Sequence, residues 1–150
     1  MQHSFLFEEG YWKASGYYYT EKGEAHQVEG QVRIYHEDDL WFNDGVLKVL
    51  GQESIEIRNR YEVIPWAEGQ EMTTWFSINP GLGALEGTFT IVEDCILSQY
   101  QDEKGNFSGA EVIIKTACNR YLNRGVLVYK GKDKLSSWSV ELLRDQNPQT

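Results

Sequence analysis

Short segments in which apolar and polar residues alternate one by one make up most of this chain. Between residues 25 and 36, for example, Val28, Val32 and Ile34 share one parity, while charged and amide side chains occupy the other. A period of two places successive side chains on opposite faces of a β-strand. Clusters of Gly, Pro, Asp and Asn separate the segments, and none follows the 3.6-residue period of a helix over ten positions. The sequence therefore predicts an all-β protein with almost no helix.

The alternating segments predict about ten short strands, joined in sequence by tight turns. They lie at residues 12–20, 25–36, 40–42, 46–50, 54–65, 72–78, 85–91, 96–101, 110–119, 125–129 and 135–144. Residues 43–45 give a turn or bulge signal between two of them. Sequential hairpins form a meander, and about ten strands suffice to close a barrel. We expect one domain over residues 1–150, an antiparallel up-and-down β-barrel whose tail at 145–150 frays. An antiparallel β-sandwich is the alternative.

Trp12 opens the first predicted strand and Arg144 ends the last one, where a sheet that closes on itself would bring them together. A guanidinium laid over an indole adds a cation–π term of about 0.5–2 kcal/mol to apolar burial. We therefore assign Trp12 and Arg144 a structural role in closing the barrel. Gly16, Gly30 and Gly87 lie inside strands, which favours a barrel because closing a curved sheet requires glycine.

The opening Gly10-Tyr11-Trp12, together with Arg144 in the last strand, resembles the signature of the lipocalin and calycin families. This resemblance implies an up-and-down barrel of the kind that mostly holds small apolar ligands. Fatty-acid-binding proteins carry a helical pair between their first two strands, and here only residues 21–24 stand in that place. That subfamily does not fit the sequence.

Two other groups share part of the opening. With Gly16 and Tyr18, it looks like the start of nitrobindin-type haem barrels, which use a late histidine as iron ligand. No histidine follows His36 in this chain, so we expect neither haem nor another cofactor. The cyanobacterial phycobilin lyases of lipocalin type also share the Gly-x-Trp opening. The resemblance thus indicates a kind of barrel and assigns no subfamily.

The chain is acidic, with a net charge of -9 and a pI near 4.8. Non-specific nucleic-acid binding depends on clustered Lys and Arg, so the charge argues against nucleic acid as a partner. The sequence has no run of 18 apolar residues, so we do not expect it to insert into a membrane. Residues 1–9 lack the basic start and long apolar middle of a signal peptide, so we expect a cytoplasmic protein.

No reactive constellation stands out in the sequence. His26 and His36 have acidic neighbours, but an extended strand would separate the two imidazoles by about 33 Å, so no metal site is expected. Cys95 and Cys118 are too few for a disulfide framework and are interpreted as reduced core or wall residues. The nucleophile motif Gly-x-Ser-x-Gly is absent, and the glycine-rich residues 81–87 lack the lysine and helix of a phosphate loop.

Strand parity predicts a mostly apolar interior with a few polar groups, which is typical of a small-ligand pocket and equally of a filled core. The candidate ligand-binding residues are Tyr18, Ile34, Asn59, Tyr61, Phe76, Phe89, Ile114, Tyr129 and Trp138. The favoured hypothesis is a protein that binds a small apolar or amphipathic molecule inside the barrel. One alternative is a lyase or isomerase on the same barrel, for example like the phycobilin lyases, with His36 or a cavity tyrosine moving a proton. The absence of a clustered acid–base pair counts against this enzyme. The other alternative is a filled barrel that binds proteins on its outer face.

Overall fold

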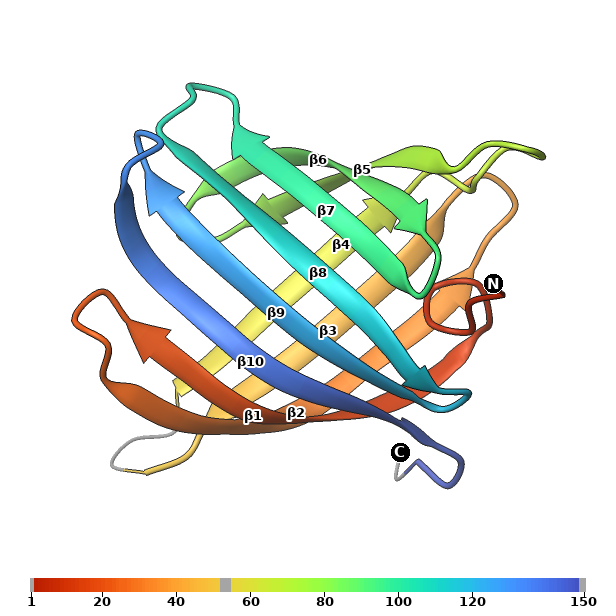
Figure 1. Cartoon of the computed structure of the whole chain (residues 1–150), viewed down its shortest axis with the longest axis horizontal. Helices are drawn as coiled ribbons and strands as arrows, with labels where there is room; N and C mark the ends of the chain where they lie inside the picture. The colour runs from red at the N-terminus through yellow and green to blue at the C-terminus, as the bar shows by residue number, and fades with distance from the viewer. Residues whose placement is uncertain (1, 52–54, 149–150) are drawn as a thin grey trace.

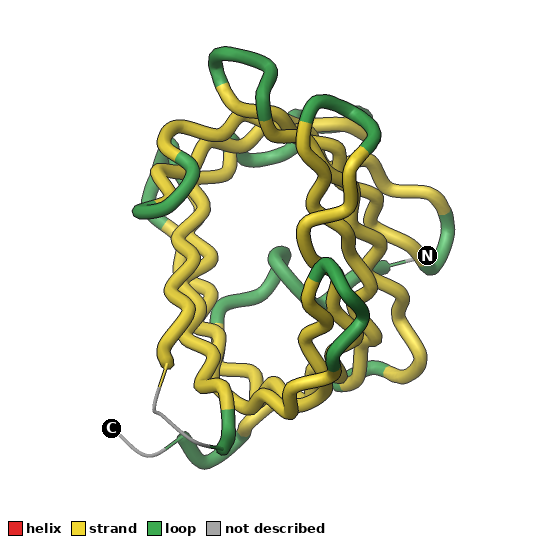
Figure 2. Tube along the Cα trace, turned by 90° about the vertical axis from the view of Figure 1, so that its left-hand side faces the viewer, coloured by secondary structure: helices red, strands yellow, loops and turns green. Residues whose placement is uncertain are grey.

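The structure is a computed structural model that describes residues 2–51 and 55–148. Its strands are β1 (Gly10–Thr20), β2 (Ala25–His36), β3 (Trp41–Val49), β4 (Ile55–Val63), β5 (Met72–Asn79), β6 (Gly83–Val92), β7 (Cys95–Asp102), β8 (Phe107–Ala117), β9 (Arg120–Tyr129) and β10 (Asp133–Asp145). Each strand pairs antiparallel with the next, and β10 pairs with β1 to close the barrel (Figure 1). This confirms the predicted all-β up-and-down barrel and rules out the sandwich. Figure 2 shows the strands on all sides of the interior. No helix long and apolar enough to cross a membrane occurs among the described residues.

Some predicted boundaries were wrong. Residues 43–45 form no turn: they lie within β3 and pair with both β2 and β4. Strand β9 begins at Arg120, five residues before the predicted start at residue 125. The predicted strand start at Ser54 lies outside the described residues. So do residues 149–150 of the predicted tail, whereas Asp145 is the last residue of β10.

Trp12 and Arg144 lie opposite each other where β1 and β10 close the sheet. The Arg144 guanidinium is 5.8 Å from the centroid of the Trp12 ring, which is fully buried. The two terminal nitrogens of Arg144 donate to the Glu8 carboxylate at 2.9 Å and to the Glu9 carbonyl at 2.8 Å. These bonds tie the segment that precedes β1 to the last strand.

The amino-terminal residues 3–7 close one end of the barrel (Figure 1). Phe5 and Leu6 are almost completely buried, and the Phe5 ring packs edge-on against Trp12 and tilted against Tyr121. The Tyr121 hydroxyl accepts the Ser4 and Phe5 amides and bonds His3 Nδ1, while His3 Nε2 bonds the Glu93 carbonyl. Hydrogen bonds to β9 and to the turn between β6 and β7 therefore hold this segment as a cap.

The pairing of β4 with β5 is the shortest in the barrel, with only three residue pairs, from Tyr61–Ser77 to Val63–Trp75. Beyond Tyr61 the two strands diverge toward the end where β4 begins and β5 ends. The amino-terminal cap lies where β1 begins, and β5 runs in the same direction as β1. The last residues of β5 therefore lie at the opposite end of the barrel from the cap. The wall is thus least continuous at the uncapped end.

Candidate ligand-binding site

The barrel encloses a cavity of about 390 Å³, partly open to solvent. Its aromatic lining consists of Phe5, Tyr18, Tyr61, Trp75, Tyr100 and Trp138. Its aliphatic lining consists of Ala14, Val28, Val32, Leu47, Ile57, Leu82, Leu85, Ile113, Leu127, Val140 and Leu142. The remaining polar side chains are those of Asn43, Asn59, Asn79, Glu111, Asn123 and Ser136. A concave, mostly apolar space of this size with a few convergent polar groups is the usual form of a small-molecule site.

Glycines opposite large rings keep this space open. Trp138 lies flat over Gly125, so a Cβ added at Gly125 would come within 2.1 Å of the indole. Trp75 lies over Gly87 and Tyr100 over Gly109 in the same way. A side chain at any of these glycines would push the ring away from the wall and into the cavity. The small residues therefore determine how much room a ligand has.

Glu111 is the only carboxylate among the described residues that line the cavity. It comes from the middle of β8, where Ser98 of β7 and Gly125 of β9 flank it. Trp138 Nε1 donates to the Glu111 carboxylate and to Asn123 Oδ1, both at 3.1 Å. Burial raises the pKa of Glu111 to about 7, although hydrogen bonds from Trp138 and Asn123 favour the charged form. The cavity thus holds one carboxyl group that titrates near neutral pH.

Two tyrosines share this environment. Burial, with the nearby Glu111 charge as a second cause, raises the pKa of Tyr61 and of Tyr100 well above the usual value of 10. Both phenols therefore stay neutral at physiological pH. The Tyr100 hydroxyl donates to the Val126 carbonyl at 3.3 Å, which fixes its position on the wall.

Four of the predicted ligand-binding residues line this cavity: Tyr18, Asn59, Tyr61 and Trp138. Ile34 and Phe89 are buried in the core beside it. Tyr129 ends β9 and packs against Phe107 near the uncapped end.

Phe76 and Ile114 differ from the prediction. Phe76 is 37 % exposed on the outer face, because its neighbours Trp75 and Ser77 point inward. Ile114 likewise points outward, because Ile113 occupies the inner face of β8. Neither residue lines the interior.

The alternative proton donor His36 also lies away from the cavity. Its Nε2 donates to the Leu6 carbonyl at 2.8 Å, and its ring stacks on Trp41 with centroids 4.2 Å apart. His36 therefore holds the amino-terminal cap in place. No group of three or more potential metal ligands occurs among the described residues.

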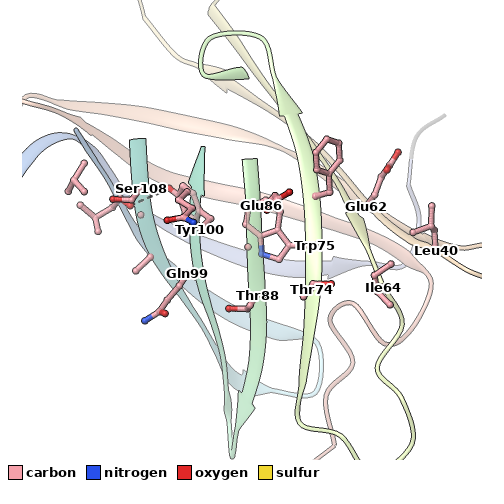
Figure 3. Close-up of a pocket in the computed structure, with 17 residues that line it drawn as sticks. Leu40, Glu62, Ile64, Thr74, Trp75, Glu86, Thr88, Gln99, Tyr100 and Ser108 are labelled. Atoms are coloured by element: carbon pink, nitrogen blue, oxygen red, sulfur yellow. Dashed lines mark hydrogen bonds between the residues drawn. The ribbon is translucent and has the colours of Figure 1, made fainter. Parts of the chain in front are cut away.

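A second, larger depression lies on the outer face of the barrel, over β4 to β9 (Figure 3). Glu62, Glu86, Thr88 and Gln99 line it beside apolar side chains such as Ile64. It is more open to solvent than the interior cavity, so a small molecule there would leave more of its surface in water than a ligand in a typical pocket does. The interior cavity is therefore the stronger candidate.

Comparison with known proteins identifies the fold. No protein-family model matches the chain, and no curated protein matches it. An S-type phycobiliprotein lyase, CPES from Guillardia theta, is similar in structure, with a TM-score of 0.72 and 11 % identity over 97 % of this chain and 93 % of that one. An N-terminal dehydratase from the difficidin assembly line matches with a TM-score of only 0.28 and 8 % identity, over 96 % of this chain and 81 % of that one. At these identities the first likeness shows the fold alone, and that fold is a lipocalin-like barrel.

Proposed function

We propose that this protein binds a small, partly apolar molecule inside its barrel. The observation that carries the proposal is the cavity of about 390 Å³, which is capped at one end by residues 3–7 and walled by aromatic and aliphatic side chains. A ligand there would bury most of its surface, and the polar side chains would orient it. The hollow interior speaks against the alternative of a filled, protein-binding barrel.

The gap between β4 and β5 is the proposed route into the cavity. Asn79 Nδ2 bridges to Asn59 Oδ1 across it at 3.5 Å, a long and weak hydrogen bond. Asn79 Oδ1 also accepts the Gly81 and Leu82 amides, which places Leu82 over the cavity. A small movement of this turn would widen the opening without breaking the barrel.

Glu111 gives a reason to keep an enzyme as the second candidate. A carboxyl with a pKa of about 7 in a ligand cavity can donate or accept a proton at neutral pH. The proton-moving group of a lyase or isomerase would then be Glu111, and not His36. The likeness to a phycobiliprotein lyase is a reason to include bilins among the ligands tested.

The unpaired thiols of Cys95 and Cys118 are compatible with the proposed cytoplasmic location.

Native mass spectrometry of the protein purified from its own host tests the binding proposal, with an absorption spectrum of the same sample. We compare the wild type with Leu47→Trp, which fills the cavity, and with Lys48→Trp, which adds the same ring on the exposed outer face of β3. A stoichiometric extra mass in the wild type and in Lys48→Trp, lost in Leu47→Trp, supports the proposal. An apo mass that stays unchanged after exposure to fatty acids, retinoids and bilins contradicts it.

A further inference from the structure

The charge inside the cavity is unbalanced. Glu111 lies among its lining residues, whereas no Lys, Arg or His of the described chain lines the same space. Neutral donors alone, from Trp138 and Asn123, stabilise the carboxylate. Glu111 is half-buried, and a carboxylate that is partly removed from water with no cation beside it is costly to ionise. A ligand that brings the opposite charge would be attracted to Glu111 and would lower that cost.

Aromatic rings line the same cavity as the carboxyl group of Glu111. The Tyr61 ring meets Trp75 edge-on with centroids 4.8 Å apart, and Trp75 lies 5.7 Å from Tyr100. Trp138, whose indole nitrogen bonds Glu111, completes this set of rings on the cavity wall. The faces of such rings attract cations, and the attraction grows when water is excluded.

We propose that the cavity selects a small organic cation, a flat apolar molecule that presents a protonated amine or amidine to Glu111 and lies among Tyr61, Trp75, Tyr100 and Trp138. This inference rests on the proposed function and adds the chemical class of the ligand. The net charge of -9 acts in the same direction, since it attracts cations and repels anions before they reach the barrel.

Three probes that share one ring system and differ in charge test the inference: 2-naphthylmethylammonium, the neutral 2-naphthylmethanol and the anion 2-naphthoate. Isothermal titration at pH 8 gives their affinities. We expect the cation to bind at least about tenfold more tightly than the alcohol, and the anion to bind most weakly. Glu111→Gln keeps an acceptor for Trp138 and should remove the preference for the cation over the alcohol. Glu29→Gln removes one carboxylate from the exposed outer face of β2 and should preserve it.

The pH dependence provides a second readout. The other titratable groups of the lining are Tyr18 on β1, Tyr61 on β4 and Tyr100 on β7. Burial raises the pKa of Tyr61 and of Tyr100 well above the usual value of 10, so these two phenols do not ionise between pH 6 and 8. On the neighbouring strands β7 and β9, the residues beside Glu111 are the uncharged Ser98, Asn123 and Gly125, with the phenol of Tyr100 next along β7. Because the cation requires the ionised carboxylate, its affinity should fall about tenfold from pH 8 to pH 6. In Glu111→Gln it should stay constant.

The outcomes separate this inference from the proposed function. Equal binding of the cation and the alcohol, or a cation preference that survives in Glu111→Gln, overturns the inference and leaves cavity binding intact. Failure of the cation to bind at all also overturns it, and the native mass spectrum then still decides the proposed function on its own. Loss of binding in Leu47→Trp, with binding kept in Lys48→Trp, places the probe inside the barrel.

Discussion

The substitution Glu111→Gln should stabilise the empty barrel at high pH and not at low pH. In the folded protein, burial raises the pKa of Glu111 from its ordinary value of 4.5 to about 7. One pKa unit corresponds to about 1.36 kcal/mol, so the ionised form is about 3 kcal/mol less favourable in the folded than in the unfolded chain. Glutamine has a similar shape, keeps an acceptor for Trp138 and never ionises.

The sign follows from proton binding. Between pH 4.5 and about 7 the folded protein holds a proton on Glu111 that the unfolded chain has released. Stability therefore falls as the pH rises through this window, and it levels off above pH 7. Below pH 4.5 both states are protonated, so Glu111 imposes no penalty there.

Urea denaturation at pH 4, 6 and 8 measures the effect as the free energy of unfolding of Glu111→Gln relative to wild type. The difference should grow by about 3 kcal/mol in favour of the variant between pH 4 and pH 8. The control Glu29→Gln, on the outer face, should show a nearly constant difference. A Glu111→Gln difference that stays constant with pH, or that shrinks as the pH rises, would refute the assignment of Glu111 as a desolvated carboxyl group.

Three further predictions concern the barrel itself. Trp12→Ala should lower the free energy of unfolding by about 3–5 kcal/mol, because it empties a fully buried site at the closing seam; urea denaturation measures this, and a loss below about 1 kcal/mol would contradict it. Gly30→Ala places a Cβ 1.8 Å from a backbone oxygen of β3, so it should destabilise the folded protein by about 1–3 kcal/mol or prevent folding. The Cβ of Gly45→Ala meets nothing closer than 3.4 Å, so this variant should be tolerated. Equal thermal unfolding midpoints of the two variants would argue against this packing. Tyr121→Phe removes the hydroxyl that holds the cap, so it should destabilise the folded protein by about 1–3 kcal/mol and speed up hydrogen exchange at residues 3–5. Unchanged exchange protection at these residues would show that other contacts hold the cap.

The fold could be predicted because its signals are local. Alternation of apolar and polar residues, as in Ala25–His36, defines a strand whatever surrounds it, and β2 has the predicted bounds. The turn clusters indicated that each strand is followed directly by its neighbour in the sheet. A meander of about ten strands is compatible with few topologies. The false turn at residues 43–45 arose because Asn, Asp and Gly are turn residues by preference. In β3, pairing on both sides overrides that preference.

The candidate site was predicted less well because parity gives two faces without saying which one is inside. In β8, Ile114 was assigned to the interior, and the structure places it on the outer face. The cavity receives Glu111 and Ile113 instead. The misleading signal was physical: a carboxylate in mid-strand normally faces water.

One sequence signal could have corrected the assignment of β8. Gly109 shares the parity of Glu111, and a strand glycine often marks a position where a ring or backbone comes close. The same ambiguity explains why Phe76 was predicted to line the cavity when Trp75 does. Two adjacent aromatic residues give no indication of which of them faces inward. The amino-terminal cap was missed since residues 3–7 show no period, and their burial depends on contacts with distant turns.

A crystal structure of the protein with 2-naphthylmethylammonium at pH 8 would show whether the cation binds inside the barrel and contacts Glu111. We expect the naphthyl ring inside the barrel among Tyr61, Trp75, Tyr100 and Trp138, with the ammonium nitrogen about 2.8 Å from a Glu111 carboxylate oxygen. A probe bound in the outer depression over β4 to β9, with the interior collapsed around Trp138, would contradict binding inside the barrel.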